Sequence, residues 1–376
     1  MSNKINDDFD IINMSNKDIY SNSKRDISSH SHYEDISSTS PKKPKKSKKR
    51  KKKSKAKLIL KICAVLLCLC IVFAAAFYIY AYNLIDKIER VPLDEKDLGI
   101  TTDIYADVQN IALLGLDTRS DNNIGRADAN VILTIDKANN KIKLTSIARD
   151  TYVAIEGRKK DKLTHAYAFG RSQLSVKTLN QNFGLEITDY VTMNFFELAR
   201  IIDKMGGVEL DVSEAEFKEL NGYVIPTTDF GDIPCEKLSS AGVQTLSGAQ
   251  AVCYARIRHT DGDVERGNRQ KEVLMAMFSK AKSMSIFDLP ELASLVVKEC
   301  STSLSTSDII SLGVWAVISD PEFEQLSIPN DNIKATNKTI NGIWYYTYDL
   351  ELAKSEIHDF IFEKGFYDPK NKPEEK

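Results

Sequence analysis

Short apolar runs recur between Val108 and Asp150, and they predict a buried sheet. Ile111 to Leu116, Val131 to Ile135 and Ile142 to Ala148 are each apolar and bounded by turn residues, which is the pattern of buried strands. Charged residues stand at the ends of these runs: Asp117, Arg119, Arg126, Asp128, Arg149 and Asp150. Because ligands bind at strand ends in α/β sheets, this stretch predicts a functional site.

Farther along the chain, strand-like runs alternate with helical patterns, which predicts an α/β fold. Helices are expected at Leu174–Phe183, ended by Gly184, and at Phe196–Met205. Strands are expected at Tyr190–Phe195 and Val208–Val212. The C-terminal part predicts two amphipathic helices and a last strand, at Asp308–Ile318, Leu350–Phe362 and Ile343–Tyr348.

An uncharged run from Ile62 to Tyr82 predicts one transmembrane helix, which we place at residues 58–82. At about 1.5 Å rise per residue, this run spans roughly 30 Å, the hydrocarbon thickness of a bilayer. The basic cluster from Pro41 to Lys57 predicts a cytoplasmic N-terminus, and hence an extracellular C-terminal domain at the cell membrane. The chain then divides into a disordered basic tail (1–57), the span, a linker (83–106), one domain (107–366) and a disordered tail (367–376).

The charge is divided between the two sides of the span. Residues 1–61 carry about +10, so the remainder carries about −12 of the total of −2. The basic tail favours anionic lipid headgroups. The acidic outer part is not a general polyanion-binding surface, so nucleic acid is not expected as a partner and its arginine groups indicate a specific site.

The six cysteines give no disulfide framework and no zinc pattern. Three of them, Cys63, Cys68 and Cys70, lie in the span. Cys235, Cys253 and Cys300 lie outside it with irregular spacing, and Cys253 is expected to be a buried thiol.

Two carboxylates, Asp117 and Asp128, are candidate ligands for Mg²⁺. This ion takes oxygen ligands and commonly combines one or two carboxylates with water and substrate phosphate oxygens. The alternative is that both residues cap loops, since Asp is common in turns.

Arginines form two candidate groups, and the guanidinium fork matches phosphate geometry. The first group is Arg119, Arg126 and Arg149. The second lies between Leu246 and Met277, where Ser247 is a candidate cap of a short helix. Arg256 and Arg258 alternate in an extended segment, and Arg266, Arg269 and Gln270 share a helix face. These groups predict a pyrophosphate pocket; the alternative is a salt-bridge network with Asp261, Asp263 and Glu265.

The chain carries none of the motifs of a covalent nucleophile. It lacks GxSxG, HExxH and Walker A sequences. A lone His165, near Lys162 and Thr164, is expected to be an ordinary polar or packed residue. The residues therefore favour catalysis by carboxylates, a bound metal ion and arginines, without a covalent nucleophile.

Seven motifs resemble the LytR-CpsA-Psr family in order and spacing, over most of residues 108–285. They are LLGLDTR, GRADANVILTID, LTSIARDTYV, KLTHAYAFG, DYVTMNF, DKMGGVELDV and LSGAQAVCYARIRHTDGDVERGNRQKEVL. The resemblance implies an α/β/α sandwich with a central mixed sheet, behind one transmembrane helix. It also implies a membrane-anchored phosphotransferase, mostly found in Gram-positive bacteria. Such an enzyme moves a glycopolymer, such as teichoic acid or capsule, from a polyprenyl pyrophosphate carrier to peptidoglycan.

The resemblance also implies residue roles. Asp117 and Asp128 are expected to hold Mg²⁺. Arginines are expected to bind the pyrophosphate, with Asp263 and Gln270 close by: Arg119, Arg149, Arg256, Arg258, Arg266 and Arg269. Arg126 falls at the Arg of the family's R-S-D motif. The chain departs from that pattern at Ala127 and Ala129, and it has Ala148 where the family's S-x-P-R-D motif has Pro.

The expected mechanism is attack by a peptidoglycan hydroxyl on phosphorus, with charge stabilised by Arg149, Arg256 and Arg258. Asp128 or Asp150 is the candidate base. The lipid tail is expected in an apolar cavity between the sheet and the helices 174–183 and 196–205. The alternatives are a glycolipid-binding protein, a pyrophosphatase and a membrane-bound transcriptional attenuator of wall genes.

Overall fold

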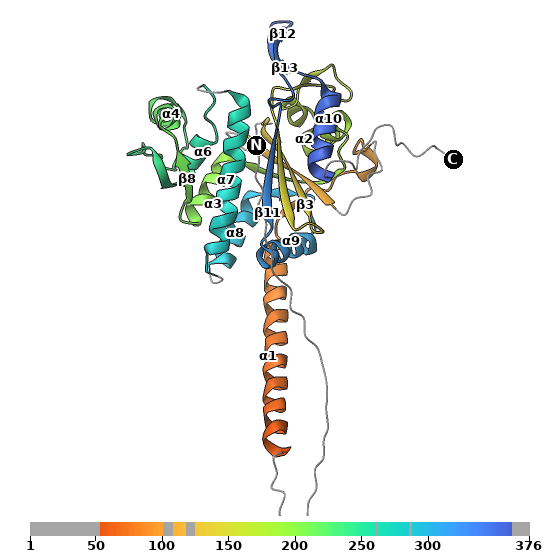
Figure 1. Ribbon diagram of the computed structural model, residues 1–376, viewed down its shortest axis with the longest axis vertical. Coiled ribbons are helices and arrows are strands. Elements are labelled where there is room, and N and C mark those ends of the chain that lie inside the picture. The colour runs from red at the N-terminus through yellow and green to blue at the C-terminus, as the bar shows by residue number, and fades with distance from the viewer. Residues whose placement is uncertain (1–52, 101–107, 118–124, 260–261, 286–287, 363–376) are drawn as a thin grey trace, which may run out of the picture. The chain divides into compact units, whose positions relative to one another are not determined.

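A seven-stranded mixed sheet organises the fold (Figure 1). The computed structural model describes residues 53–100, 108–117, 125–259, 262–285 and 288–362. The strands follow the order β1-β10-β7-β2-β3-β4-β11. In that order they are Glu89–Arg90, Ser301–Thr302, Ile187–Asn194, Val108–Leu116, Ala127–Asp136, Lys141–Ile147 and Glu322–Ile328. β2, β3 and β4 form an antiparallel meander, whereas β7 pairs with β2, and β11 with β4, in parallel.

The two faces of the sheet are covered by different helices, because side chains alternate along each strand. Leu114, Ile132 and Ile147 pack with α2 (His165–Phe183) and α10 (Leu350–Phe362) on one face. Leu113, Leu133 and Leu144 face the other way, toward α7 (Asp263–Ser283) and α9 (Thr306–Ser319). The result is the expected α/β/α arrangement with a mixed central sheet.

A second cluster of apolar side chains lies beside the sheet and joins α3 (Phe195–Lys204) to α6 (Gly248–Tyr254). Its strands β8 (Val208–Val212) and β9 (Gly242–Leu246) form a separate antiparallel pair. Short helical segments cover this pair: α4 (Glu214–Glu219), the π-helix η2 (Leu220–Val224) and α5 (Ile225–Thr227). The helix α8 (Leu289–Glu299) contacts α3.

Smaller pieces complete the fold. The pairs β5 with β6 and β12 with β13 are two-stranded hairpins. Their bounds, with those of the 3₁₀ helix η1, are Tyr152–Val153, Asp161–Lys162, Thr336–Ile340, Ile343–Thr347 and Glu95–Asp97. The expected last strand is therefore β13, outside the main sheet. The stretch 83–106, expected to be a linker, contributes β1 and η1 over its described part.

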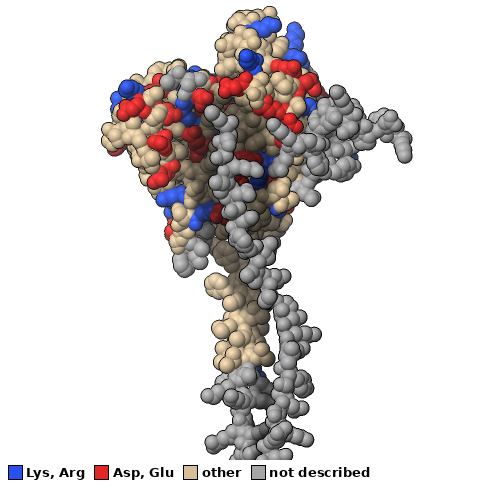
Figure 2. Space-filling view, viewed as in Figure 1, with Lys and Arg blue, Asp and Glu red and all other residues tan. Residues whose placement is uncertain are grey.

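Helix α1 (Lys53–Ile85) contains the predicted span, and residues 59–85 are long and apolar enough to cross a membrane. The basic tail expected over residues 1–57 lies mostly outside the described residues. All six cysteines are free, and the Sγ atoms of Cys235 and Cys253 lie 3.9 Å apart. The face seen in Figure 2 carries Asp and Glu side chains over much of its upper part, with Lys and Arg interspersed.

Candidate active site

A polar pocket of about 270 Å³ brings together seven of the predicted site residues. They are Asp117, Asp128, Arg149, Arg256, Arg258, Arg266 and Gln270. The first three come from the strand ends of the meander, and the others from the segment after α6 and from the start of α7. Residues more than 100 positions apart in the sequence therefore line one cleft.

The end of the β2–β3 pair positions the two aspartates. The ladder shifts register between Gly115 and Leu116, and such bulges re-aim side chains beside functional sites. A side chain at Gly115 would place its Cβ 2.8 Å from Cβ of Ala129, so the two backbones approach closely here. The backbone N–H of Asp117 then donates to the carbonyl of Arg126 at 3.0 Å.

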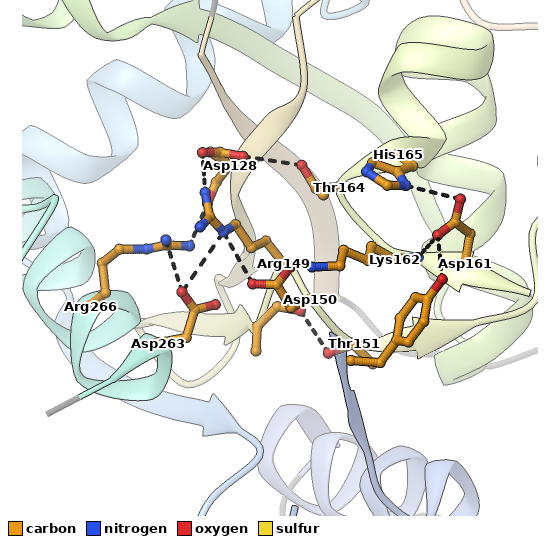
Figure 3. Close-up of polar contacts among 12 residues, drawn as sticks. Asp128, Arg149, Asp150, Thr151, Asp161, Lys162, Thr164, His165, Asp263 and Arg266 are labelled. Carbon is orange, nitrogen blue, oxygen red and sulfur yellow. Dashed lines mark hydrogen bonds and ion pairs between the residues drawn. The ribbon is translucent and has the colours of Figure 1, made fainter. Parts of the chain in front are cut away.

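Arg149 is the centre of a network of carboxylates (Figure 3). Its Nη1 donates to Asp128 Oδ2. Its Nε lies 3.4 Å from Asp150 Oδ2 and 3.8 Å from Asp263 Oδ1. Burial opposes the charge of Arg149, but the three carboxylates outweigh it and raise the pKa of the guanidinium. Arg149 is therefore a fixed cation at the wall of the pocket.

Asp263 forms an ion pair with a second arginine of the pocket, Arg266. Arg266 Nη1 lies 2.8 Å from Asp263 Oδ1, and Nη2 donates to the carbonyl of Asp128 at 3.0 Å. Both side chains are buried, and burial lowers the pKa of Arg266 and raises that of Asp263. Within the described residues, buried Arg266 Nε and Asp263 Oδ2 have no hydrogen-bond partner. Such unpaired polar atoms are costly, which is consistent with a polar ligand at this site.

Arg256 and Arg258 reach the pocket from the chain that leaves α6. Ser247 caps this helix as predicted: its Oγ accepts from Gln250 N, and Gln250 Oε1 accepts from Ser247 N at 2.9 Å. Ile257 between the arginines is fully buried. Both guanidinium groups line the pocket, and Arg256 Cζ lies 5.7 Å from the Phe195 ring centroid. Arg256 lies in a turn, not in the predicted extended segment, since its N–H donates to the Cys253 carbonyl at 3.0 Å.

Four residues predicted at the pyrophosphate are not among the described residues that line the pocket: Asp263, which pairs with Arg266, and three arginines. Arg269 is engaged within the fold, because its Nε donates to Glu216 Oε1 at 2.6 Å and its Nη1 to the Ile257 carbonyl. Arg269 does not line the pocket, and its partner Glu216 is not one of the carboxylates of the predicted salt-bridge alternative. Part of that alternative is present instead in the pair of Arg266 with Asp263. Arg126 is exposed and does not line the pocket. Arg119 lies outside the described residues.

The sequence analysis did not identify several pocket residues. Phe195, Tyr223, Thr227, Thr228 and His259 also line the cleft. The imidazole of His259 lies 2.9 Å from Glu219 Oε1 and packs edge-on against Tyr223. Tyr223 and the two threonines come from η2, α5 and the residue that follows, which have no apolar periodicity long enough to predict.

The residues around Lys162 form a polar extension of the network (Figure 3). Lys162 Nζ donates to Asp150 Oδ1 at 2.5 Å, and Thr164 Oγ1 donates to Asp128 Oδ1 at 3.2 Å. His165 pairs with Asp161 at 2.9 Å, in agreement with the expectation of an ordinary polar residue. Lys162 and Thr164 therefore fix the positions of Asp150 and Asp128, the two carboxylates that contact Arg149.

An apolar cavity of about 420 Å³ lies on the sheet face opposite α2. Its walls include Leu113, Leu133 and Leu144 of the sheet, Leu274 of α7 and Leu312 of α9. This cavity does not adjoin helices 174–183 and 196–205, the expected location of the lipid cavity.

A second cavity of about 650 Å³ does lie beside the start of α2 and α3, with Ser172, Thr192 and Phe196 in its wall, but its lining is largely polar. The part of α2 expected to line a cavity, with Val176, Leu179 and Phe183, belongs to a packed core.

The fold and the pocket define an α/β protein with an arginine-rich polar pocket and, among the described residues, one helix long enough to span a membrane. The sequence profile of the LytR_cpsA_psr family matches residues 76–358. The polyisoprenyl-teichoic acid–peptidoglycan teichoic acid transferase TagU of Oceanobacillus iheyensis is 34% identical, over 67% of this chain and 75% of its own. The TagU of Bacillus subtilis (strain 168) is 29% identical, over 72% and 82%. The chain belongs to the LytR_cpsA_psr family.

Solved structures agree with this assignment. TagT bound to LIIa-WTA superposes with a TM-score of 0.57 and 27% identity, over 72% of this chain and 99% of that one. TagT with bound octaprenyl pyrophosphate lipid superposes with a TM-score of 0.54 and 26% identity, over the same shares.

Proposed function

We propose that the chain is a phosphotransferase that moves a teichoic-acid-type glycopolymer from a polyprenyl pyrophosphate carrier to peptidoglycan. The observation that carries the proposal is the gathering of four arginines and two aspartates in one pocket. The similar proteins named as teichoic acid transferases and the TagT structure with octaprenyl pyrophosphate support it.

The charge at the pocket surface suits this reaction. The charged residues of the lining are Arg149, Arg256, Arg258 and Arg266 with Asp117 and Asp128, a net charge of +2, while Asp150 and Asp263 pair with Arg149 and Arg266 behind that surface. A diphosphate esterified at both ends carries two negative charges. Transfer to a hydroxyl gives one phosphodiester, one phosphomonoester and a proton, so the products carry one more negative charge than the donor. Fixed guanidinium groups stabilise this developing charge.

The proposed step forms a bond between the acceptor oxygen and the phosphorus attached to the glycan. The bond from that phosphorus to the bridging oxygen breaks, and polyprenyl phosphate leaves. Arg256 and Arg258 stabilise the transferred group, and Arg149 stabilises the leaving oxygen. Asp128 lines the pocket, whereas Asp150 is engaged by Lys162 and Arg149. Both carboxylates contact Arg149, but only Asp128 lines the pocket, so Asp128 is the proposed acceptor of the hydroxyl proton when it is released from Arg149. A loose transition state requires little help from a base.

Asp117 and Asp128 are the proposed holders of Mg²⁺. Both line the pocket, and their oxygens are the donor type that Mg²⁺ prefers. The described residues contain no group of three or more His, Cys, Asp or Glu that could hold a metal. The two aspartates therefore fit an ion whose remaining ligands are water and substrate phosphate. When bound, such an ion neutralises phosphate charge.

The apolar cavity is the proposed site of the donor's prenyl chain. We place the protein in the cell membrane with its N-terminus in the cytoplasm and the catalytic domain outside, because the basic residues before α1 favour that orientation.

The test uses the full chain in liposomes that contain labelled carrier-linked glycan, with peptidoglycan oligomers and Mg²⁺ added. Glycan joined to peptidoglycan is the expected product. Release of glycan phosphate without joining would indicate a pyrophosphatase, and retention of intact donor would indicate a binding protein. Either result overturns the proposal. Omission of the metal should abolish joining, and equal joining with a chelator present would remove Mg²⁺ from the mechanism.

A further inference from the structure

Helix α9 is apolar on almost every side. Asp308 is its only charged residue. One face, with Ile309, Leu312 and Trp315, lines the apolar cavity. On the remaining surface Val317 and Ile318 are 63% and 77% exposed. A helix that is apolar all round belongs inside a protein or in lipid, so this exposed face needs a partner.

The start of α9 is fixed to the end of the candidate membrane span. Thr306 Oγ1 donates to Asp86 Oδ1 at 2.9 Å and accepts from Arg90 Nη2 at 2.5 Å. The same Arg90 nitrogen donates to the carbonyl of Ile85, the last residue of the span, at 3.2 Å. The first turn of α9 therefore lies where the chain leaves the bilayer.

The other end of α9 is fixed to the sheet. Asn140, in the turn between β3 and β4, donates from Nδ2 to the carbonyl of Ser319 at 2.8 Å. Figure 1 shows α9 lying across this end of the sheet. The polar pocket lies at the opposite end of β2, whose nine residues span about 30 Å at roughly 3.3 Å each.

We propose that α9 lies in the outer leaflet of the bilayer, with Val314, Val317 and Ile318 among the acyl chains. The apolar cavity then opens onto lipid beside α9, and a prenyl chain enters it sideways without crossing water. The hydrogen bonds that join the start of α9 to the end of the span favour lipid as the partner that covers the exposed face of α9. This inference rests on the membrane-anchored transferase proposed above and adds the route by which its donor enters.

The first test replaces Val317 by a photoreactive diazirine amino acid in the full chain, in phosphatidylglycerol and phosphatidylethanolamine liposomes. Mass spectrometry then identifies the adduct formed on illumination. Val243 on β9, 66% exposed, is the matched control, and Phe73 in the span is the positive control. A phospholipid adduct is expected at 317 and 73 but not at 243.

The outcomes separate this inference from the proposed function. Lipid adducts at 73 without any at 317 overturn the placement of α9 and leave the transferase intact. Adducts between two protein copies at 317 overturn it in favour of a dimer interface. If neither position 317 nor position 73 forms a lipid adduct, α1 is not inserted in the bilayer and the proposed membrane anchor is refuted.

The second test measures the entry route. A double Val317→Asn and Ile318→Asn variant is compared with Val243→Asn, and all three positions are exposed, so folding is preserved. Loss of lipid contact at two side chains is expected to lower transfer from bilayer donor about tenfold. Transfer from a soluble short-chain donor should stay at the level of the control. An equal loss with both donors, or no loss with either, overturns the proposal.

Discussion

Arg256 and Arg258 differ from the other arginines of the pocket. Arg149 and Arg266 are each held by carboxylates. In the part of the chain that the structure describes, neither Arg256 nor Arg258 has an ion-pair partner, and Arg256 instead lies near the Phe195 ring. These two guanidinium groups therefore have donors available for a ligand, whereas Arg149 must exchange partners to bind one.

Removal of either available arginine should impair catalysis more than folding. Arg256→Ala and Arg258→Ala are each expected to lower transfer by roughly 10²-fold or more, because each removes a preorganised donor to the developing charge. The measurement is the initial rate in the liposome assay. Arg158→Ala, an exposed arginine that stacks on Phe169, is the matched control and should retain its rate. A wild-type rate in either pocket variant would remove that residue from the mechanism.

Arg269 should behave in the opposite way. Its guanidinium is buried against Glu216, so Arg269→Ala leaves a carboxylate without its partner and is expected to cost about 3–5 kcal/mol of unfolding free energy. Denaturant unfolding of the full chain in detergent measures this. Arg200→Ala breaks an exposed pair with Glu299 and should cost less than about 1 kcal/mol. Equal costs would show that Arg269 has no structural role.

At the scale of elements, the helices and strands that the sequence predicts correctly are those with a clear apolar pattern or a terminating glycine. Helix α10 begins and ends where its pattern predicts, and Gly184 ends α2 in the left-handed conformation. Helix α2 begins nine residues earlier than expected because its first part contains a kink at Gly170 and Arg171. The strand β11 was missed, since most of its side chains are only half-buried and give no clear alternation.

The candidate site was predictable in its residue types but not in its geometry. The strand ends and the arginine spacing selected seven residues that meet in one pocket. Sequence alone did not separate Arg269 from Arg266, because residues three apart on a helix are neighbours and the partner of Arg269, Glu216, comes from a distant element, α4. It also gave no sign of the face of the sheet that holds the cavity, since that depends on which helices cover the sheet.

The contact between α3 and α6 positions the segment with Arg256 and Arg258. A Cβ added at Gly248 would lie 1.9 Å from the Ala199 carbonyl oxygen, so the helices must separate. Gly248→Ala is expected to lower the free energy of unfolding by about 1–3 kcal/mol and to slow transfer. Gly222→Ala adds a methyl group where no atom lies within 4 Å, and it should change stability by less than about 1 kcal/mol. Similar unfolding curves for both variants would contradict this.

The docking of α10 on the end of α2 depends on a buried histidine. His358 lies 2.8 Å from the Gly184 carbonyl, and burial lowers the pKa of its imidazole. The unfolded chain therefore takes up a proton that the folded chain does not. Stability should fall as pH drops below about 6.5, by up to about 1.4 kcal/mol per pH unit from this group.

Comparison of unfolding at pH 7.5 and pH 5.5 tests this dependence. His358→Gln should be less stable overall but should lose less stability on acidification than the natural chain. His259→Gln, at a half-exposed position, is the control and should keep the full dependence. An unchanged dependence in the His358 variant would show that other groups cause it.

For the whole molecule, the basic N-terminal stretch and the acidic domain that follows the span are expected to have different partners. The proposed chemistry uses only residues after the span, so deletion of residues 1–50 should leave the rate of transfer in liposomes within about twofold, apart from weaker attraction to anionic lipid. The basic residues 51–57 remain to fix the orientation. Loss of transfer in this variant would favour a regulatory role for the tail.

The ion pair between Arg149 and Asp128 has a consequence for selectivity. In the free protein the guanidinium is already satisfied, so an incoming anion must compete with a carboxylate for it. Inorganic phosphate is expected to lose that competition, whereas the proposed diphosphate donor has more oxygens with which to contact the arginines of the pocket. The pocket thereby stays open to its donor in a medium crowded with simpler anions.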